Sequence, residues 1–230
     1  KFEIKGVTAF NDLQRLCCNN IKNYPGHTTY TQMLNSNGGI VADLTVTCID
    51  TNSFRIVTGS SVREHDKKHI SENLSKNTTL IDITESLACF GVFGPKSREI
   101  LTEIFGDYFS KDNFKFATSK EISMNNYKLI FQRLSFVGEL GWEIYVPINI
   151  SREIYLELVK VGEKYNLSHA GAHALDIMRM EKGYLHWGHD ISPAENPFEA
   201  GLELTVKLNK KIDFIGKEAL KIKNRIKKKQ

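Results

Sequence analysis

The sequence lacks the features of several large protein classes. No apolar run approaches the ~20 residues that a membrane span needs, and the opening residues KFEIKG do not resemble a signal peptide. The four cysteines, Cys17, Cys18, Cys48 and Cys89, have neither CxxC spacing nor the density of a disulfide-rich secreted scaffold. We therefore expect reduced, buried thiols in a cytoplasmic protein, and the missing initiator Met suggests an excised piece of a longer chain.

Motifs for nucleotides, metals and nucleophilic catalysis are also missing. The chain contains no GxGxxG after a strand, no GxxxxGK[ST] and no GxSxG. His65 and His69 are four residues apart, as metal ligands on a helix can be, but no third ligand candidate stands at a fixed spacing. We therefore expect a solvated helix face there and no metal site.

Charge is concentrated at the C-terminal end of the chain. The net charge is +4, and residues 207–230 hold ten Lys or Arg against Asp213 and Glu218, so residues 1–206 are net negative. The closing segment KIKNRIKKKQ could contact nucleic acid or an acidic membrane. A solvated helix end or a linker explains it with fewer assumptions, so we expect neither partner.

Short strands and helices are interleaved in the first third of the chain. The pattern favours a β-hairpin, because TTYTQMLN and GGIVADLTVTCID flank the turn NSNGG. A helix is expected over residues 61–74 with Ser60 as its N-cap. The further elements expected here are strands in FEIKG and SFRIVTG and a helix in TAFNDLQRLCCNN, which contains Cys17 and Cys18.

The pattern restarts at Thr79. Strands are expected in TLIDIT and LACFGVFG, followed by an amphipathic helix in KSREILTEIF, three strands joined at NNY and GELG, a helix from Ser151, and a helix in AHALDIMRMEKGYL. Antiparallel strands with interspersed helices indicate an α+β fold. We expect one module over residues 1–230, with subdomains 1–78 and 79–206 and the basic segment 207–230.

Two acidic residues stand inside expected strands, where acidic side chains are uncommon. Asp43 alternates with Ala42 and Leu44 in IVADLTV, so the simplest reading is that it faces water. Glu143 follows Trp142 in a strand that begins after a tight turn between Gly138 and Gly141. Its side chain either faces water or binds a ligand in a cleft. A buried carboxylate without partners would cost several kcal/mol, so burial would require a ligand or an Arg.

Two more residues are candidates for the same chemistry. Arg179 could supply a cation, although a surface pair with Asp176 or Glu181 explains it as well. Trp187 lies between His186 and His189 in KGYLHWGHD, where a structural role is at least as well supported as direct chemistry.

Several separated blocks follow one another along the chain: YTQMLNSNGGIVADLTV, FGVFGPKSREIL, SFVGELGWEIYVP, GAHALDIMRMEKGYLHWGHDI and NPFEAGLELTVKLNKKIDFIGKEAL. In this order they resemble one family: the aminomethyltransferase (T-protein) of the glycine cleavage system and the tetrahydrofolate-binding half of dimethylglycine and sarcosine dehydrogenases. The residues in YTQMLN, GELGWE and FIGKEAL resemble the dimethylglycine and sarcosine branch more than the glycine-cleavage branch.

The resemblance implies roles for these residues. It places Asp43 in a central cleft beside the reactive nitrogens of tetrahydrofolate, as the catalytic residue. It makes Glu143 a ligand of the pterin ring, because a carboxylate accepts paired N–H bonds from an aminopyrimidine edge. Arg179 would suit the anionic end of the folate, and Phe136 and Trp187 complete the expected folate-binding set.

The sequence departs from the family pattern at three points. Phe136 stands where the glycine-cleavage branch usually has Tyr, which preserves stacking and removes a hydroxyl. The resemblance also implies that a C-terminal β-barrel domain is lacking. The flavin-binding half is missing too, so FAD would have to come from a separate or upstream domain or flavoprotein partner.

The expected function is transfer of a one-carbon unit to tetrahydrofolate, giving 5,10-methylenetetrahydrofolate. The donor would be an iminium or formaldehyde equivalent from a methylated glycine, or an aminomethyl carrier protein. One alternative is a non-catalytic folate-binding or assembly protein of the same fold, but its KGCYxGQE-like cysteine is absent from KGYLHWGHD. The other is a folate-dependent demethylase of a sulfonium compound, whose product would be methyltetrahydrofolate.

Overall fold

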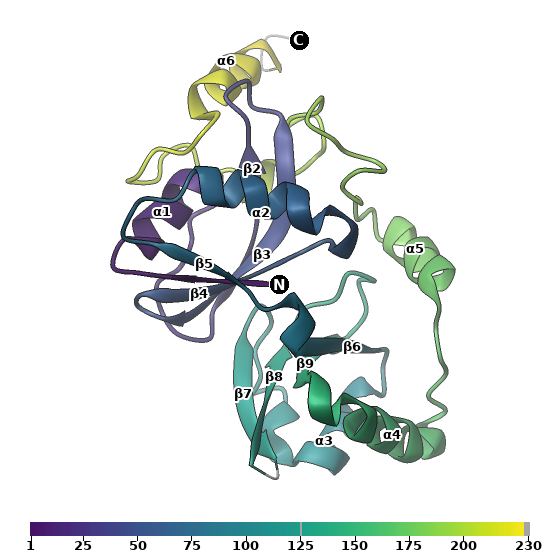
Figure 1. Cartoon of the computed structure of the whole chain (residues 1–230). Helices are drawn as coiled ribbons and strands as arrows, with labels where there is room; N and C mark the ends of the chain where they lie inside the picture. Colours follow the sequence, from purple (N-terminus) through teal and green to yellow (C-terminus); the bar gives the residue numbers. More distant parts are fainter. Residues whose placement is uncertain (125, 228–230) are drawn as a thin grey trace. The chain divides into compact units, whose positions relative to one another are not determined.

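The chain forms two compact units. The computed structural model describes residues 1–124 and 126–227 (Figure 1). Unit 1 comprises Lys1–Ile83 and Leu185–Gln230, and unit 2 comprises Thr84–Tyr184. The expected division at residue 78 is close to this boundary, whereas residues 185–206 belong with the N-terminal unit. The expected turn at NNY includes residue 125, which lies outside the described residues.

Unit 1 is built on a five-stranded antiparallel sheet of order β2-β3-β4-β1-β5. Its strands agree with the expected pattern, including the hairpin whose turn is residues 35–39. Its elements are β1 (Phe2–Lys5), α1 (Ala9–Leu16), β2 (Thr28–Leu34), β3 (Ile40–Asp50), β4 (Ser53–Thr58), α2 (Arg63–Glu72), β5 (Thr79–Asp82) and α6 (Lys217–Lys227).

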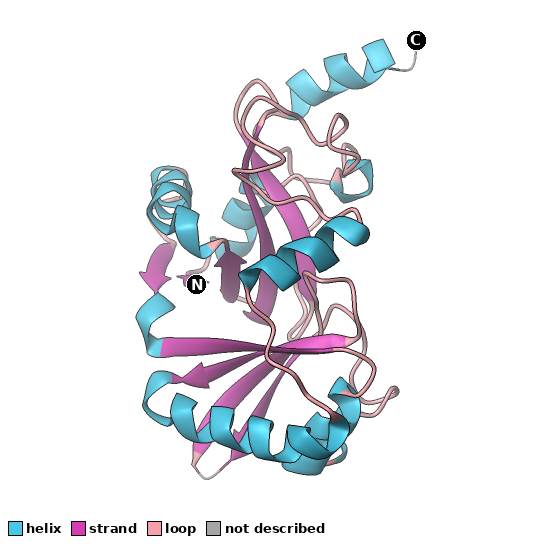
Figure 2. Cartoon of the chain, turned by 90° about the vertical axis from the view of Figure 1, so that its right-hand side faces the viewer, coloured by secondary structure: helices cyan, strands magenta, loops and turns pink. Residues whose placement is uncertain are grey.

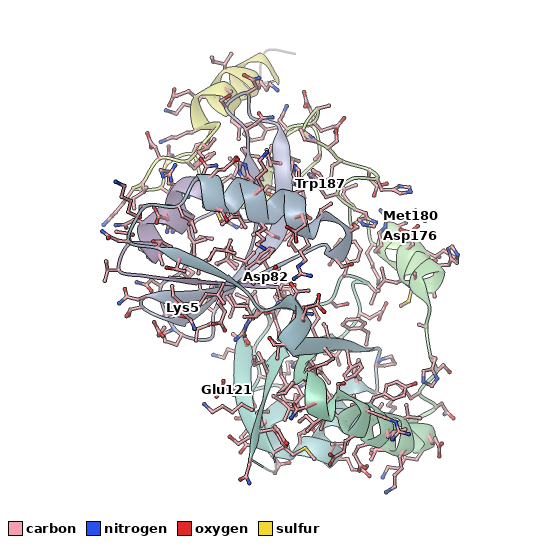
Figure 3. The ribbon with its side chains drawn as sticks, viewed as in Figure 1. Lys5, Asp82, Glu121, Asp176, Met180 and Trp187 are labelled. Carbon is pink, nitrogen blue, oxygen red and sulfur yellow. The ribbon has the colours of Figure 1, made fainter. Side chains whose placement is uncertain are left out.

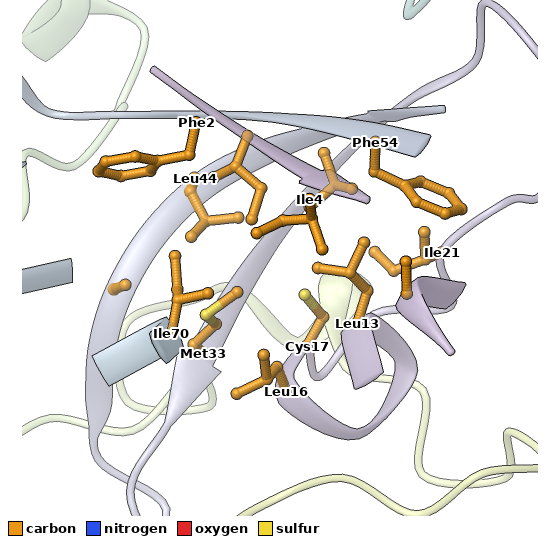
Figure 4. Close-up of a cluster of buried hydrophobic side chains, with 14 of the residues drawn as sticks. Phe2, Ile4, Leu13, Leu16, Cys17, Ile21, Met33, Leu44, Phe54 and Ile70 are labelled. Carbon is orange, nitrogen blue, oxygen red and sulfur yellow. The ribbon is translucent and has the colours of Figure 1, made fainter. Parts of the chain in front are cut away.

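One face of this sheet is covered by α1 and α2. Leu13 and Leu16 from α1 and Ile70 from α2 pack against the strand side chains Leu44 and Phe54, all with less than 4% of their surface exposed (Figure 4). The alternation seen in residues 40–48 places Ala42, Leu44 and Val46 on this face. The odd-numbered residues of β3, including Asp43, therefore point to the opposite face.

The C-terminal part of unit 1 packs against the turn end of the β2–β3 hairpin. Leu34 and Ile40 pack with Phe198, Phe214 and Leu220 in a second buried cluster. This part contains a short 3₁₀ turn, Glu203–Thr205, next to β2. Residues 207–220 are thus folded against unit 1, and the expectation of a solvated helix end or linker applies to residues 221–230, of which 221–227 continue α6. Residues 228–230 of the basic segment lie outside the described residues.

Unit 2 contains a four-stranded antiparallel sheet of order β6-β9-β8-β7. The three expected strands after residue 118, and the helices on either side of them, are present. Its elements are β6 (Leu87–Phe93), α3 (Ser97–Phe105), β7 (Ser119–Met124), β8 (Tyr127–Gln132), β9 (Gly141–Pro147), α4 (Ser151–Gly162) and α5 (Ala172–Glu181).

The core of unit 2 lies between its sheet and the helices α3 and α4. Trp142, Ile144 and Val146 point from β9 into this core and meet Leu101 of α3 and Leu158 of α4. Figures 1 and 2 show α3 and α4 along one side of the strands of this unit. Since neighbouring residues of a strand point to opposite faces, Glu143 lies on the face away from these helices.

Two local expectations were wrong. The helix expected to contain Cys17 and Cys18 ends at Leu16, and Cys17 has extended backbone angles and forms an isolated bridge with Met33. Ser60 begins a 3₁₀ turn ahead of α2, whose N-cap position is Val62, so Ser60 does not cap the helix. Within the described residues, no helix combines the length and the apolar character needed to cross a membrane.

Candidate functional site

Asp43 is held by polar side chains on the neighbouring strand and does not simply face water. It lies opposite Gln32 in the β2–β3 register, and the amide nitrogen Nε2 of Gln32 donates to Oδ1 of Asp43 at 2.8 Å. The hydroxyl of Tyr30, two residues earlier on β2, also hydrogen-bonds the carboxylate. These neutral donors stabilise the carboxylate without cancelling its negative charge.

Burial raises the pKa of Asp43 from 3.8 to about 6. The hydrogen bonds from Gln32 and Tyr30 act in the opposite direction, and the nearby charge of Asp66, a buried residue of α2, raises the pKa slightly further. Burial and the charge of Asp43 raise the pKa of Tyr30 well above its ordinary value, so Tyr30 remains a donor. A carboxylate that takes up a proton near pH 6 is suited to acid–base work at neutral pH.

Glu143 has a similar set of partners in unit 2. Its Oε2 accepts a 2.5 Å hydrogen bond from the hydroxyl of Tyr145 and lies 3.5 Å from Nε2 of Gln132, its cross-strand neighbour. Burial raises the pKa of Glu143, and the bond from Tyr145 partly offsets that effect. The side chain of Glu143 is half-buried, so it does not lie on a fully solvent-exposed face of the strand.

The loop before Glu143 is shaped by two glycines. Gly138 has φ +70°, and a Cβ there would come within 2.3 Å of Lys182. A Cβ on Gly141 would lie 2.4 Å from the carbonyl oxygen of Val92. The loop between them, with half-buried Phe136 just before it, is therefore fixed closely against its surroundings, as the expected tight turn requires.

Arg179 is buried and already has partners. Only 2% of its surface is exposed, Nε and Nη2 lie 2.8 and 2.6 Å from Oδ1 of Asp176, and Nη1 donates to the carbonyl oxygen of Tyr184 at 2.9 Å. Figure 3 labels Asp176 on α5. The pairing with Asp176 is confirmed, but it is not a surface pair, because the guanidinium is enclosed.

Trp187 belongs to unit 1, in the segment that follows α5 (Figure 3), and it packs against the buried cluster that contains Leu34 and Ile40. Its ring nitrogen Nε1 donates to the carbonyl oxygen of Ile40 at 2.9 Å, and its ring centroid lies 5.1 Å from that of His65. Ile40 opens the strand that carries Asp43. The rings of His186 and His189 lie 6.1 Å apart on either side of Trp187 along the chain.

The four cysteines are free thiols in this structure. Cys17, Cys18 and Cys48 are free and buried, as expected, whereas Cys89 is free but exposed, which corrects the expectation of buried thiols throughout. Burial raises the pKa of Cys17 to about 12. Among the described residues, no group of three or more His, Cys, Asp or Glu side chains is arranged to hold a metal ion.

Each unit also has a surface hollow. The hollow in unit 1 has a volume of about 870 Å³ and is lined by residues that include Asn19, Val206 and Lys210. That in unit 2 has a volume of about 290 Å³ and is lined by residues that include Arg133 and Tyr184. Neither Asp43 nor Glu143 is among the described residues that line them, so these hollows do not define a site for the two acids.

The partners of the two acids were missed from sequence. Gln32, Tyr30 and Thr205 around Asp43, and Gln132 and Tyr145 around Glu143, carry no motif of their own. The hairpin register could have identified Gln32, because two strands that flank a five-residue turn place it near Asp43. Asp43 and Trp187 belong to unit 1, and Phe136, Glu143 and Arg179 to unit 2, so their use of one folate remains a prediction.

Known proteins resemble this chain over nearly its whole length. It is 37% identical over 224 residues to human mitochondrial dimethylglycine dehydrogenase (Homo sapiens), which covers 96% of this chain and 26% of that protein. It is 32% identical over 218 residues to the aminomethyltransferase of Halothermothrix orenii, covering 94% of this chain and 60% of that enzyme. The chain therefore spans only part of the relatives that it matches.

The fold has a solved counterpart. The crystal structure of glycine cleavage system aminomethyltransferase T from Bartonella henselae superimposes with a TM-score of 0.86 at 22% identity, covering 98% of this chain and 60% of that one. This likeness establishes the α+β architecture. The family described as "GCVT N-terminal domain" matches residues 1–210, and the chain belongs to that family.

Proposed function

We propose that this chain binds tetrahydrofolate and transfers a one-carbon unit to it, giving 5,10-methylenetetrahydrofolate. The observation that supports this most directly is Asp43, a half-buried carboxylate on β3 with a pKa of about 6 and two neutral donors. The names of two relatives, a dimethylglycine dehydrogenase and an aminomethyltransferase, agree with chemistry at an amine-bound carbon.

Asp43 is the proposed catalytic group. Tetrahydrofolate supplies the nucleophilic amines that accept the carbon. Above pH 6 the Asp43 carboxylate can take the proton that an attacking amine must lose, or stabilise a cationic donor by its negative charge. Gln32 and Tyr30 keep the carboxylate oriented while it does so.

Glu143 is the proposed anchor for the heterocycle. An ionised carboxylate can accept two N–H bonds from an aminopyrimidine edge, and the bond from Tyr145 favours that ionised form. Phe136 in the loop ahead of it offers an aromatic face for stacking, and Trp187 offers another in unit 1. We retain Arg179 as a proposed residue for the folate carboxylates, through an exchange of its Asp176 partner.

The donor and any flavin belong to the proposal as well. A methylated glycine would have to be oxidised before its carbon could be transferred, and that step needs FAD on another domain or protein. An aminomethyl carrier protein would deliver the carbon without such a step. A chain that binds tetrahydrofolate and transfers nothing would instead fit a non-catalytic folate-binding role, and methyltetrahydrofolate as the product would indicate demethylation of a sulfonium compound.

The binding experiment is an anaerobic calorimetric titration of tetrahydrofolate into the full chain. Glu143→Gln should weaken binding by about tenfold, because one charge-assisted contact is worth about 1.5 kcal/mol, and Asp43→Asn should change it little. Asp50→Asn, on the exposed end of β3, and Glu121→Gln, on β7, are matched controls. Equal affinity of all variants would remove Glu143 from the site, and no binding at all would refute the proposal.

A further inference from the structure

We propose that Gln32 is a positioning residue for Asp43, and that the hydroxyl of Thr205 from the C-terminal part of unit 1 fixes which way its amide points. This inference rests on the proposed function only for its catalytic consequence. Its structural content is a chain of contacts from the 3₁₀ turn Glu203–Thr205 through β2 to β3.

Gln32 has hydrogen-bond partners at both ends of its amide. The side chain has no exposed surface. Nε2 donates to Asp43 at 2.8 Å, while Oε1 accepts from Oγ1 of Thr205 at 2.5 Å and from Sγ of Cys18 at 3.5 Å. An ionised Asp43 can only accept, whereas Thr205 and Cys18 can donate to Oε1, so the amide is oriented with its NH₂ toward Asp43.

A rotated amide would be unfavourable while Asp43 is ionised. It would place the oxygen of Gln32 against the carboxylate, so that two acceptors would face each other, and Thr205 would have to accept from the NH₂ group where it now donates. Oγ1 of Thr205 also lies 2.7 Å from the carbonyl oxygen of Leu202, and a hydroxyl donates its one proton to one oxygen at a time. Donation to Gln32 is the arrangement that matches an ionised Asp43.

The position of Thr205 is itself fixed by packing and backbone contacts. Val206 is buried in the cluster that contains Cys18, and the amide nitrogen of Lys207 donates to the carbonyl oxygen of Cys18 at 2.9 Å. A residue 173 positions away in sequence from Gln32 is thereby held against β2. The C-terminal part of unit 1 therefore acts on the environment of Asp43 without touching it.

The groups that influence ionisation of Asp43 come from several elements. They are Tyr30 and Gln32 on β2 and the carboxylate of Asp66 on α2, with the uncharged Thr205 acting through Gln32. Of these, the amide of Gln32 is the donor whose orientation depends on a second side chain. Removing the hydroxyl of Thr205 should therefore raise the pKa of Asp43, as removal of the Gln32 amide should, but by a smaller amount.

The test is a ¹³C NMR titration of the Asp43 carboxyl in the full chain labelled at aspartate, with Asp43→Asn used for assignment. Gln32→Met keeps the length of the side chain and removes the donor, so the carboxyl should titrate about one pH unit higher. Thr205→Val should move it by about half as much, and Thr205→Ser should restore the wild-type value.

Thr28→Val is the matched control for loss of a buried threonine hydroxyl on the same hairpin. The hydroxyl of Thr28 bonds that of Thr47 at 2.9 Å, away from Asp43, so this variant should titrate as wild type does. If Gln32→Met fails to fold, judged by thermal unfolding, Thr205→Val and Thr205→Ser decide the question. An unchanged titration in Gln32→Met, or in Thr205→Val when only that variant folds, would overturn the proposal.

The kinetic readout separates this inference from the proposed function. In a transfer assay, Gln32→Met should lower kcat and move the acidic limb of the pH profile upward, with KM for tetrahydrofolate nearly unchanged. If the wild-type chain shows no transfer, the proposed function fails, but the NMR titration still tests the link between Thr205, Gln32 and Asp43.

Discussion

Gln132 lies opposite Glu143 across β8 and β9 in the same relation that Gln32 has to Asp43 across β2 and β3. In each case the acid also accepts a bond from a tyrosine hydroxyl, and in each case it points away from the helices that cover its sheet. Both units therefore provide a half-buried carboxylate whose donors, among the described residues, are neutral side chains. Such a group keeps its negative charge available to a ligand, which a partner Arg or Lys would neutralise.

Asp43→Asn should slow one-carbon transfer by about 10²-fold, as expected for loss of one electrostatic or acid–base group. The measurement is the rate of 5,10-methylenetetrahydrofolate formation from formaldehyde and tetrahydrofolate, corrected for the uncatalysed reaction. Asp50→Asn should match wild type. Wild-type activity should also fall as the pH drops below about 6, where Asp43 takes up a proton. Full activity of Asp43→Asn would exclude Asp43 from the chemistry.

Asp43 should lower the stability of the free protein at neutral pH. Its folded-state pKa of about 6 lies above the ordinary value of 3.8, so the folded state binds more protons between these values. The contribution of this carboxyl to folding therefore declines as the pH rises from about 4 to about 6. Asp43→Asn should raise the free energy of unfolding at pH 7.5 by about 1–3 kcal/mol in urea titrations, and less at pH 4. A less stable variant at pH 7.5 would contradict this.

Tyr145→Phe should weaken tetrahydrofolate binding without removing Glu143. Loss of the hydroxyl takes away the bond that favours the ionised carboxylate, and the pKa of Glu143, already raised by burial, should rise further. Affinity should drop about 3- to 10-fold, the equivalent of one hydrogen bond, and more at pH 6 than at pH 8. Tyr127→Phe, on the exposed side of β8, is the matched control. Equal losses in both variants would argue against a specific role.

Lys210→Ala should destabilise the protein, although lysine substitutions on a basic segment usually have small effects. The ammonium group of Lys210 donates to the carbonyl oxygens of Gln14, in the last turn of α1, and of Cys17 and Asn19 just beyond it, and burial lowers its pKa to about 8. Leaving these oxygens without a donor should cost about 1–3 kcal/mol in urea unfolding. The neighbouring exposed Lys211, changed to Ala, should cost less than about 0.5 kcal/mol.

Most elements were predictable because local patterns specify them. The strict alternation around Asp43 and the turn NSNGG determine the β2–β3 hairpin, and the amphipathic spacing of residues 97–105 determines α3. The error at Cys17 arose because helix periodicity continued past Leu16, while the chain was already pairing with Met33 of β2. A contact between distant segments overrode the local pattern there.

The site was only partly predictable for the same reason. Asp43 and Glu143 were identifiable because an acid inside a strand needs a reason, but their pKa values depend on burial by segments far away in sequence. Thr205 reaches Gln32 from 173 residues away, and a single sequence gives no signal for such a contact. Lys210 was counted as part of the basic segment 207–230, because the composition of that segment does not reveal which oxygens accept from the ammonium group.

The return of residues 185–230 to unit 1 makes unit 2 an insertion within the chain of unit 1. During synthesis, residues 84–184 emerge as one continuous stretch and can complete their sheet and helices early. The cover of the β2–β3 hairpin in unit 1, by contrast, is complete only when Thr205 has left the ribosome, about 120 residues after β5. Until then β2 and β3 expose the apolar surface that this last segment covers, so the order of translation leaves the surroundings of Asp43 to be assembled last.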